Sequence, residues 1–404
     1  MPNTFFEELQ QRGFINQCSD MDTVHELLDH DKIAVYLGSD PTADSLHVGH
    51  LVPIMMMRWL QKYGHKPIML VGGATGRIGD PSGRDTSRPM MTEETLAKNI
   101  AGLKKSYSKF LHFGDGASDA IIVDNYDWMR GYTHLDFLAQ YGLDFTIPRM
   151  LSMESVKKRL ENGMSFLEFN YMTFQAVDFL TLYRKYNCVL QLCGADQWGN
   201  AIMGVELVRK KCGKEVYVLS TALLTDSNGN KIGKSAGNAV WVNEDKTSAY
   251  DYYQYFRNIG DTEVGKCLRI FTELPMDEVR RLEALKDKEI NEAKKILAFE
   301  ATKLCRGEEA AKAAAETARR TFEEGIAGGD LPTLAFTGDI ALTEALVQLK
   351  LTASKGEAKR LIAQSGVKVN DAVVSGDNIV LTAADMQNGQ IKLSVGKKKH
   401  GLIK

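Results

Sequence analysis

Hydrophobic positions in the first half of the chain alternate between two periodicities. Apolar runs of strand length end in turn residues at 32–40, 66–73, 119–125 and 187–197. Between them, apolar residues recur at helical spacing. One such stretch is residues 45–63, which ends before Gly64. Alternation of buried strands and helices is typical of a parallel sheet with helices on both faces. We therefore predict a doubly wound α/β domain over about the first 220 residues.

The second half has a different pattern. Residues 277–324 are rich in Ala, Glu, Lys and Arg and contain no proline, which predicts helices. Residues 325–340 carry Gly and Pro and predict a linker. From 341 onward the pattern predicts two short basic helices and then a strand. With 404 residues, more than one domain is expected, and the boundaries that we predict are 1–220, 221–324, 325–340 and 341–404.

Composition narrows the class of protein. The chain is 44% hydrophobic and 25% charged, as in soluble globular proteins, and no run of 18 apolar residues predicts a membrane span. The first residues include acidic side chains and no apolar core of a signal peptide. Six scattered cysteines form no CxxC pair, which argues against structural zinc and for a reducing compartment. We expect a cytoplasmic protein without a protein-bound metal.

Charge is unevenly distributed. Residues 341–404 carry ten Lys and Arg against five Asp and Glu, whereas the whole chain has a net charge of −2. A basic end on an acidic body favours a polyanionic partner, although an excess of this size also occurs on ordinary solvated surfaces.

Two glycine-rich stretches are similar to phosphate-binding loops. GGATGRIGDPSGR (72–84) resembles the turn of short-chain dehydrogenases, but DPSG would break the helix that such a turn opens, and no Tyr is followed by Lys four positions later. GNKIGKS (229–235) has Asn228 where a P-loop needs glycine. Its two lysines, Lys231 and Lys234, can still bind phosphates as point charges, with an exposed basic turn as the alternative.

Two histidines, His47 and His50, stand three positions apart in YLGSDPTADSLHVGHL (36–51), at the start of a predicted helix. Such spacing places both rings on one face. A metal site needs further ligands, and the sequence has neither HExxH nor a cysteine nearby, while a core position is possible for one of the two. Because a helix N-terminus favours anions, two imidazole donors there suit the phosphates of a nucleotide.

Together, and in this order, the stretches resemble one family. PTADSLHVGH (41–50) and KIGKS (231–235) resemble the HIGH and KMSKS signatures of class I aminoacyl-tRNA synthetases. YLGSDPTADSLHVGH, VGGATGRIGDPSGR, NYMTFQAVDFL and GADQWGN resemble bacterial-type tyrosyl-tRNA synthetases, and the similarity runs from about residue 32 to the C-terminus. The resemblance implies a Rossmann-like catalytic domain, a helical domain on the anticodon side of the tRNA, and a small α+β RNA-binding (S-four-like) C-terminal domain. It also implies a homodimer that uses about residues 111–149.

The implied activity is that of a tyrosine–tRNA ligase. ATP and L-tyrosine give tyrosyl-adenylate and pyrophosphate, and the tyrosyl group then moves to the 3′ end of tRNA(Tyr). The attacking carboxylate is already ionised, so catalysis must come from positioning and from stabilising charge on the phosphates. We expect Mg²⁺ to enter with ATP, held mainly by phosphates. The residues implied for this step are His47, His50, Lys231, Lys234, Ser235, Arg84, Arg88 and Thr42.

The resemblance also implies residues that hold tyrosine. Tyr171, Gln175 and Asp178 follow helical spacing and share one face. With Asp80, the first two surround the ammonium group, whereas Tyr36 and Asp178 bind the phenol. An exposed helix carboxylate is the alternative for Asp178. Gln197 is expected to donate toward the carboxylate of tyrosine, and the residues implied for the adenylate are Asp40, Gly49, Gly194, Asp196 and Lys234.

Departures from the family are few. Leu37 stands where these enzymes often have a cysteine that touches the ribose, and losing that hydrogen bond costs on the order of 1 kcal/mol. Arg84 replaces a common lysine, and Ile232 replaces Met or Phe. In the basic tail, the residues implied to contact tRNA through salt-dependent bonds are Lys355, Lys359 and Arg360.

Two other functions remain open from the sequence. One is an RNA-binding or scaffold protein on a catalytically retired synthetase fold, which would bind tRNA without forming adenylate. The intact phosphate-binding set argues against it. The other is a class I synthetase for another aromatic amino acid, such as tryptophan, and the pair of Tyr36 and Asp178 favours a phenol over an indole.

Overall fold

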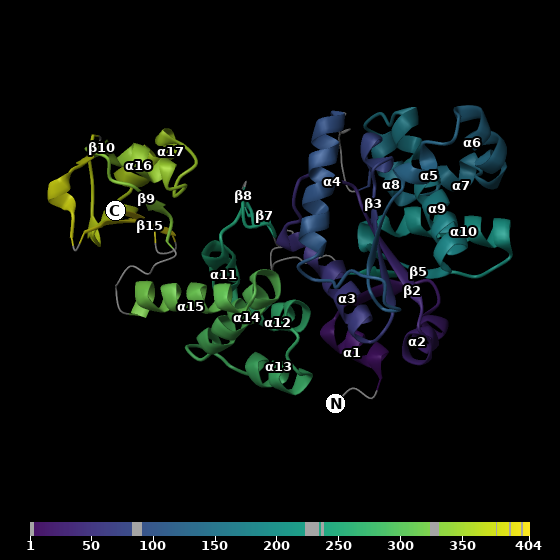
Figure 1. Cartoon of the computed structure of the whole chain (residues 1–404), viewed down its shortest axis with the longest axis horizontal. Coiled ribbons are helices and arrows are strands. Elements are labelled where there is room, and N and C mark those ends of the chain that lie inside the picture. Colours follow the sequence, from purple (N-terminus) through teal and green to yellow (C-terminus); the bar gives the residue numbers. More distant parts are fainter. Residues whose placement is uncertain are drawn as a thin grey trace. The chain divides into compact units, whose positions relative to one another are not determined.

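The computed structural model describes residues 4–82, 91–222, 234–235, 238–323, 331–376, 378–387, 389–396 and 399–404. The chain forms two compact units, labelled by element in Figure 1. The first lies within Met1–Thr247 and Ile259–Cys305, and the second within Ser248–Asn258 and Arg306–Lys404. The four predicted segments cross these two units, and their boundaries stay a prediction.

A six-stranded sheet with the order β1-β6-β5-β2-β3-β4 forms the centre of the first unit. All neighbouring pairs are parallel except the edge strand β1, which runs antiparallel to β6. The chain leaves β2 toward β3 on one side, and β5 pairs with β2 on the other. In open α/β sheets, ligands bind beyond the carboxyl ends of strands at such a switch point. The strands are β1 (Ile15–Cys18), β2 (Ala34–Ser39), β3 (Lys66–Val71), β4 (Ile121–Asp124), β5 (Cys188–Gly194) and β6 (Tyr217–Thr221).

Helices cover both faces of this sheet, which confirms the predicted doubly wound architecture. Figure 1 shows α3 (Leu51–Lys62) and α4 (Glu93–Tyr107) on one side and α9 (Phe166–Tyr186) and α10 (Trp198–Cys212) on the other. Helix α9 begins where the Ser165 hydroxyl and the Glu168 carboxylate cap each other's backbone N–H groups. It ends at Asn187, whose φ of 49° is left-handed.

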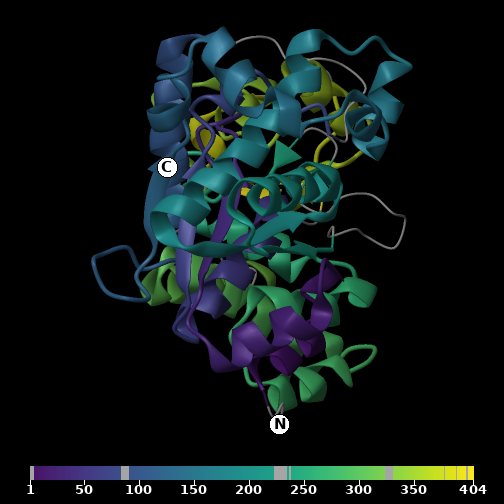
Figure 2. The same cartoon turned by 90° about the vertical axis from the view of Figure 1, so that its right-hand side faces the viewer.

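The remaining helices of the first unit lie before, within and after the sheet. The N-terminal helix α1 is held against the segment 259–305, in purple and green in Figure 2, because the buried Arg12 guanidinium donates to the main-chain oxygens of Arg269, Thr272 and Leu274. The helices are α1 (Phe5–Arg12), α2 (Met21–His30), α5 (Tyr126–Met129), α6 (His134–Tyr141), α7 (Ile147–Leu151), α8 (Glu154–Leu160), α12 (Val264–Phe271), α13 (Met276–Glu283) and α14 (Ile290–Arg306).

The second unit contains two helices, α11 (Ala249–Arg257) and α15 (Glu308–Glu323), and a small α+β fold. In that fold α16 (Leu342–Gln348) and α17 (Lys355–Ala363) pack on a five-stranded sheet with the order β12-β11-β14-β15-β9. One prediction needs correction, because helix α16 contains no basic residue. Within residues 331–340 of the predicted linker, Leu331 is buried and β9 pairs with β15. The strands are β9 (Thr333–Leu334), β10 (Ile340–Ala341), β11 (Val367–Val369), β12 (Ala372–Val373), β13 (Val380–Leu381), β14 (Ile391–Val395) and β15 (Lys399–Ile403).

Neither unit offers a membrane-spanning segment within the described ranges, since no helix there combines the length and the apolar character that crossing requires.

Candidate active site

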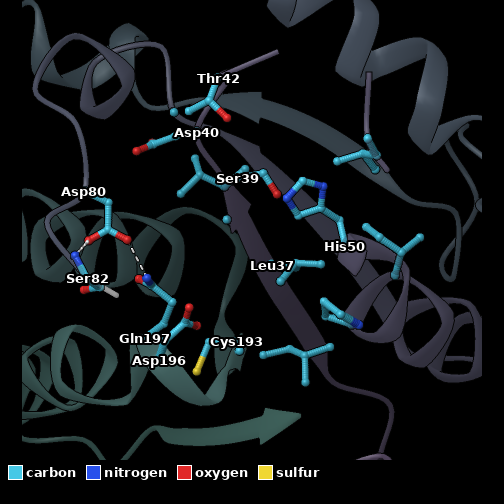
Figure 3. Close-up of a pocket in the computed structure, with 18 of the residues that line it drawn as sticks. Leu37, Ser39, Asp40, Thr42, His50, Asp80, Ser82, Cys193, Asp196 and Gln197 are labelled. Atoms are coloured by element: carbon cyan, nitrogen blue, oxygen red, sulfur yellow. Dashed lines mark hydrogen bonds between the residues drawn. The ribbon is translucent and has the colours of Figure 1, made fainter. Parts of the chain in front are cut away.

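A cavity of about 510 Å³ opens at the carboxyl ends of β2 and β5, at the switch point of the sheet. Its size is typical of small-molecule sites. Figure 3 shows His50 across this cavity from Asp80 and Gln197, with Leu37 and Ser39 of β2 between them. The structure therefore brings together predicted residues from segments far apart in the chain. Those that line the cavity are Tyr36, Asp40, Thr42, His47, Gly49, His50, Asp80, Tyr171, Gln175, Asp178, Gly194, Asp196 and Gln197.

The buried end of the cavity consists of Tyr36 and Asp178, which are 0% and 1% exposed. Asp178 accepts hydrogen bonds from Trp128 Nε1 at 2.9 Å and from Asn125 Nδ2 at 3.0 Å. Burial raises the pKa of Asp178 to about 7, against the opposing effect of these two donors. The alternative of an exposed helix carboxylate is therefore wrong.

The Tyr36 hydroxyl has no hydrogen-bond partner among the described residues. Burial, followed by the nearby Asp178 carboxylate, raises the pKa of Tyr36 well above its ordinary value, so this hydroxyl stays protonated. A buried hydroxyl without a partner costs about 1–3 kcal/mol. The buried end of the cavity therefore holds a hydroxyl that lacks a partner among the described residues.

Asp40 joins the buried end to the middle of the cavity. It accepts from the Tyr171 hydroxyl at 2.9 Å and from Thr75 Oγ1 at 2.7 Å. Asn125 Nδ2 in turn donates to Thr75 Oγ1 at 3.0 Å as well as to Asp178. One hydrogen-bonded chain thus connects the carboxylates of Asp40 and Asp178.

The glycine-rich stretch after β3 packs closely against Asp40 and Thr75 of this hydrogen-bonded chain. A Cβ atom on Gly72 would lie 2.2 Å from Asp40 Oδ1 and 2.3 Å from Thr75 Oγ1, so a larger residue would displace these two side chains. The stretch continues into a 3₁₀ turn at Thr75–Arg77. Its glycine therefore permits a close approach of side chains to the main chain, and the short-chain dehydrogenase interpretation receives no support.

On the opposite side, Asp80 is bound by its neighbours. Gln197 Nε2 donates to Asp80 Oδ2, and the main-chain N–H of Ser82 donates to Oδ1 at 3.0 Å (Figure 3). Burial raises the pKa of Asp80, and these hydrogen bonds oppose that shift. One N–H group of the Gln197 amide is therefore donated to the Asp80 carboxylate, an interaction that the sequence did not predict.

The histidine end of the cavity consists of Thr42, His47 and His50. The helix predicted from residue 45 begins later, because His47 has extended backbone angles (φ −115°, ψ 167°) and only Val48–His50 form a 3₁₀ turn before α3. The two rings stack with their centroids 3.8 Å apart, so the predicted shared face is confirmed.

Main-chain N–H groups determine which ring nitrogen carries the hydrogen. Gly49 N–H donates to His47 Nδ1 at 3.1 Å, and His47 N–H donates to His50 Nδ1 at 3.3 Å. A ring nitrogen that accepts has no hydrogen of its own, so in the neutral imidazoles the hydrogen is on Nε2. Both histidines therefore present an N–H donor without needing a positive charge.

Several predicted residues cannot be placed in the cavity. Lys231, Arg84 and Arg88 lie outside the described residues, and the side chains of Lys234 and Ser235 are likewise not described, although their main chain forms β7 (Lys234–Ser235), which pairs with β8 (Asn238–Ala239). The predicted tRNA contacts lie on α17 of the second unit. Lys359 and Arg360 are exposed there, and Lys355 pairs with Glu344 at 3.1 Å.

Four residues of the site were missed from the sequence: Thr75, Asn125, Trp128 and Gln191. Gln191 is 2% exposed, lines the cavity, lies in register with Tyr36 across β2 and β5, and has an Oε1 atom without a partner among the described residues. A glutamine inside an apolar strand was the available signal. The described residues contain no group of three or more His, Cys, Asp or Glu side chains arranged to hold a metal.

Comparison with known proteins is consistent with this geometry. Residues 28–323 match the family of class I tRNA synthetases (W and Y), and residues 322–403 match the C-terminal domain of tyrosine–tRNA ligases. The tyrosine–tRNA ligase of Rhodospirillum rubrum is 50% identical over 99% of this chain and 97% of its own length. That of Zymomonas mobilis is also 50% identical, over 99% and 98%.

Solved structures agree. A C-terminally truncated mitochondrial tyrosyl-tRNA synthetase from Aspergillus nidulans superimposes with a TM-score of 0.72 at 30% identity, over 80% of this chain and 95% of that one. The Archaeoglobus fulgidus tyrosyl-tRNA synthetase complexed with L-tyrosine has a TM-score of 0.57 at 18% identity, over 77% and 99%, which concerns the fold alone. This chain belongs to the tyrosine–tRNA ligases, a family of class I aminoacyl-tRNA synthetases.

Proposed function

We propose that the cavity reads L-tyrosine at its buried end and activates it with ATP at its histidine end, before the tyrosyl group passes to tRNA(Tyr). The observation that carries the amino-acid specificity is the buried pair of Tyr36 and Asp178. A substrate phenol donates its hydrogen to the Asp178 carboxylate and accepts one from the Tyr36 hydroxyl. An indole offers a donor but no acceptor, and a phenyl ring offers neither, so both leave a buried polar group unpaired.

Three residues near the middle of the cavity are proposed to bind the ammonium group of tyrosine: Asp80, Tyr171 and Gln175. The hydroxyl hydrogen of Tyr171 points to Asp40, so its oxygen lone pairs are oriented away from Asp40 and can accept from an ammonium group. Asp80 supplies an opposite charge. Gln197 is proposed to orient Asp80 and to donate toward the carboxylate of tyrosine through the same amide group.

At the histidine end, the Nε2–H groups of His47 and His50 and the hydroxyl of Thr42 are proposed to donate to phosphate oxygens. Such donors stabilise charge that builds up on the phosphates as the carboxylate attacks. Imidazole N–H groups and lysines are not ligands for a hard cation, so Mg²⁺ would be carried by the phosphates of ATP. The further residues proposed for this step are Lys231, Lys234, Ser235, Arg84 and Arg88, and those for the adenylate are Asp40, Gly49, Gly194, Asp196 and Lys234.

A homodimer is proposed as well. Large apolar side chains are exposed in and next to residues 111–149, as in Leu135 at 76%, Leu143 at 96% and Ile147 at 57%. Clustered exposed apolar residues mark interaction surfaces. A second copy of the chain would cover them. In the second unit, Lys355, Lys359 and Arg360 on α17 are proposed to bind the tRNA backbone, and the cytoplasm is the proposed location.

Tyrosine-dependent exchange of labelled pyrophosphate into ATP tests the proposal. We expect exchange by the pure protein with Mg²⁺ and tyrosine, and much less with tryptophan or phenylalanine. If tRNA(Tyr) binds but tyrosine does not stimulate exchange, the chain is an RNA-binding protein on a retired fold. If tryptophan stimulates exchange better than tyrosine, the assignment of Tyr36 and Asp178 is wrong.

A further inference from the structure

The turn that carries His47 is bound to a distant segment of the first unit by main-chain pairing. Val48 N–H donates to the Val240 oxygen at 2.9 Å, and Val242 N–H donates to the Leu46 oxygen at 2.8 Å. His47 therefore lies opposite Trp241 in a short antiparallel bridge, with the two rings edge to face at 5.9 Å. In the chain, this bridge follows the strands β7 and β8 directly.

Asn243 lies at the end of this bridge and is 1% exposed. Its Nδ2 donates to the main-chain oxygens of Asp44 at 3.0 Å and of Gly102 at 3.1 Å. Its Oδ1 is 3.1 Å from the hydroxyl of Ser106, which donates to it. The side-chain amide thus uses both of its hydrogens and its oxygen.

Each residue just before His47 is held by this cluster. Besides the Asp44 oxygen, the Ser45 hydroxyl accepts from the main-chain N–H of Asn243 at 3.0 Å. Leu46 N–H donates to the Ser106 hydroxyl at 3.2 Å. Both serines are buried, at 2% and 0% exposure. The cluster of Ser45, Ser106 and Asn243 therefore fixes the main chain from which the histidine turn begins.

Helix α4 is part of the same arrangement. A Cβ atom on Gly102 would lie 2.0 Å from the Asp44 oxygen, so the helix approaches this loop as closely as a backbone allows. Three segments meet at Asn243: the loop before His47, helix α4, and the segment after β8. None of these contacts involves the buried end of the cavity.

We infer that Asn243 is a positioning residue for tyrosine activation, which holds the histidine turn in the place where His47 and His50 meet the phosphates of ATP. The inference rests on the proposed role of those histidines. Activation depends on placing donors accurately around the reacting phosphate, and a displacement of about 1 Å can cost up to about 100-fold in rate. Tyrosine binding depends on other residues, so the loss of the Asn243 side chain should lower the activation rate without changing the affinity for tyrosine.

The test measures single-turnover formation of tyrosyl-adenylate by the full chain, per active site titrated, together with the Kd of tyrosine alone. Asn243→Ala is expected to slow activation about tenfold while the Kd of tyrosine stays within twofold. Ser106→Ala removes a contact of the same cluster and should slow activation in the same manner. In the double variant the two effects should be less than multiplicative, because both side chains hold one turn.

Thr272→Val provides a matched control for lost stability. Thr272 is fully buried and hydrogen-bonded to the Leu268 oxygen, but it belongs to the segment 259–305 rather than to the cavity. This variant should unfold at a lower temperature and keep the normal activation rate per active site. A structural role alone would make Asn243→Ala behave like Thr272→Val.

Several outcomes overturn the inference. An Asn243→Ala protein with a normal activation rate contradicts it, and so does one whose tyrosine binding weakens in proportion. If Asn243→Ala does not fold, Ser106→Ala decides by the same criteria. A His50→Ala variant separates the two proposals: if it is slow and Asn243→Ala is normal, only the positioning role is wrong, whereas a normal His50→Ala rate overturns the histidine role and with it this inference.

Discussion

The two ends of the cavity are built in different ways. The buried end is made of side chains, with Asp178 held by Asn125 and Trp128 and almost without exposure. The histidine end is held in place by main-chain groups. A 3₁₀ turn and a β-bridge fix the backbone of His47 and His50, and main-chain N–H groups donate to the Nδ1 atoms of both rings. His50 is exposed, whereas Tyr36 is not.

This difference matches what each end must do. Selecting one amino acid over another requires polar groups whose free-energy cost is high when they lack a partner, and burial raises that cost. Stabilising a transition state requires donors that stand in the right place beforehand, and a turn fixed by main-chain hydrogen bonds provides this. The two ends should therefore respond differently to substitution: the buried end through substrate affinity, and the histidine end through rate.

The largest expected effect is at the histidine end. His50→Ala removes a donor that is proposed to stabilise the transition state, so the rate of adenylate formation should fall on the order of 100-fold. The Kd of tyrosine should stay within about twofold, since His50 does not contact the buried end. Single-turnover kinetics and equilibrium dialysis measure the two quantities. A weakened tyrosine affinity with an unchanged rate would break the distinction between the ends.

Asp178→Asn is the corresponding change at the buried end. It replaces a charged acceptor by an amide whose NH₂ group faces the donors of Asn125 or Trp128. Hydrogen bonds to charged groups are worth about 1.5–3 kcal/mol, so tyrosine affinity should fall about 30-fold. Phenylalanine, which makes no such bond, should lose little affinity. Equal losses for both amino acids would mean that Asp178 does not read the phenol.

The pH dependence of tyrosine binding sharpens the same comparison. With the pKa of Asp178 at about 7, the carboxylate is lost as the pH falls through 7, and the Kd of tyrosine should rise about tenfold between pH 8 and pH 6. Binding is measured without ATP, so that the histidine end of the cavity does not contribute. In Asp178→Asn this dependence should disappear, and its persistence would assign the titration to another group.

The effect of Asp178 on the stability of the fold depends on pH in the opposite direction to tyrosine binding. Because folding raises the pKa of Asp178 above its ordinary value of 3.8, the fold prefers the neutral form. The contribution of Asp178 to stability is fully present below about pH 4 and is lost as the pH rises to 7. The pH range in which tyrosine is expected to bind best is thus the one in which Asp178 stabilises the fold least.

The sequence predicted the sheet and several of the residues that line the cavity. The strand pattern led to the parallel sheet, and the spacing of Tyr171, Gln175 and Asp178 placed all three on one face of α9, where they line one cavity. Such predictions work because each depends on neighbours within one element. The two histidines were placed on a shared face for the same reason, although the helix itself begins only at Leu51.

What could not be predicted depends on contacts between elements. Asn125 is one polar residue in a turn, and the two hydrogen bonds that its Nδ2 donates, to Thr75 and Asp178, exist only after three segments have come together. Asn243 is similar, because nothing in its local sequence indicates that its amide reaches both Asp44 and Gly102. The burial of Asp178, and with it the direction of its pKa shift, also follows from packing rather than from spacing.

The smallest expected effect comes from Tyr36→Phe. It removes a hydroxyl that is fully buried and has no partner among the described residues, so the free protein should become more stable by about 1 kcal/mol, and its unfolding temperature should rise by about 1 °C. One neutral hydrogen bond to the phenol is lost at the same time, so the Kd of tyrosine should rise about fivefold while that of phenylalanine does not. Differential scanning fluorimetry and equilibrium dialysis measure the pair of effects. If Tyr36→Phe destabilises the free protein instead, the hydroxyl already has a hydrogen-bond partner in the absence of tyrosine, and it does not wait for the substrate to supply one. Opposite changes in stability and affinity from one oxygen atom would mark the buried end as a site whose polar groups are completed by the ligand.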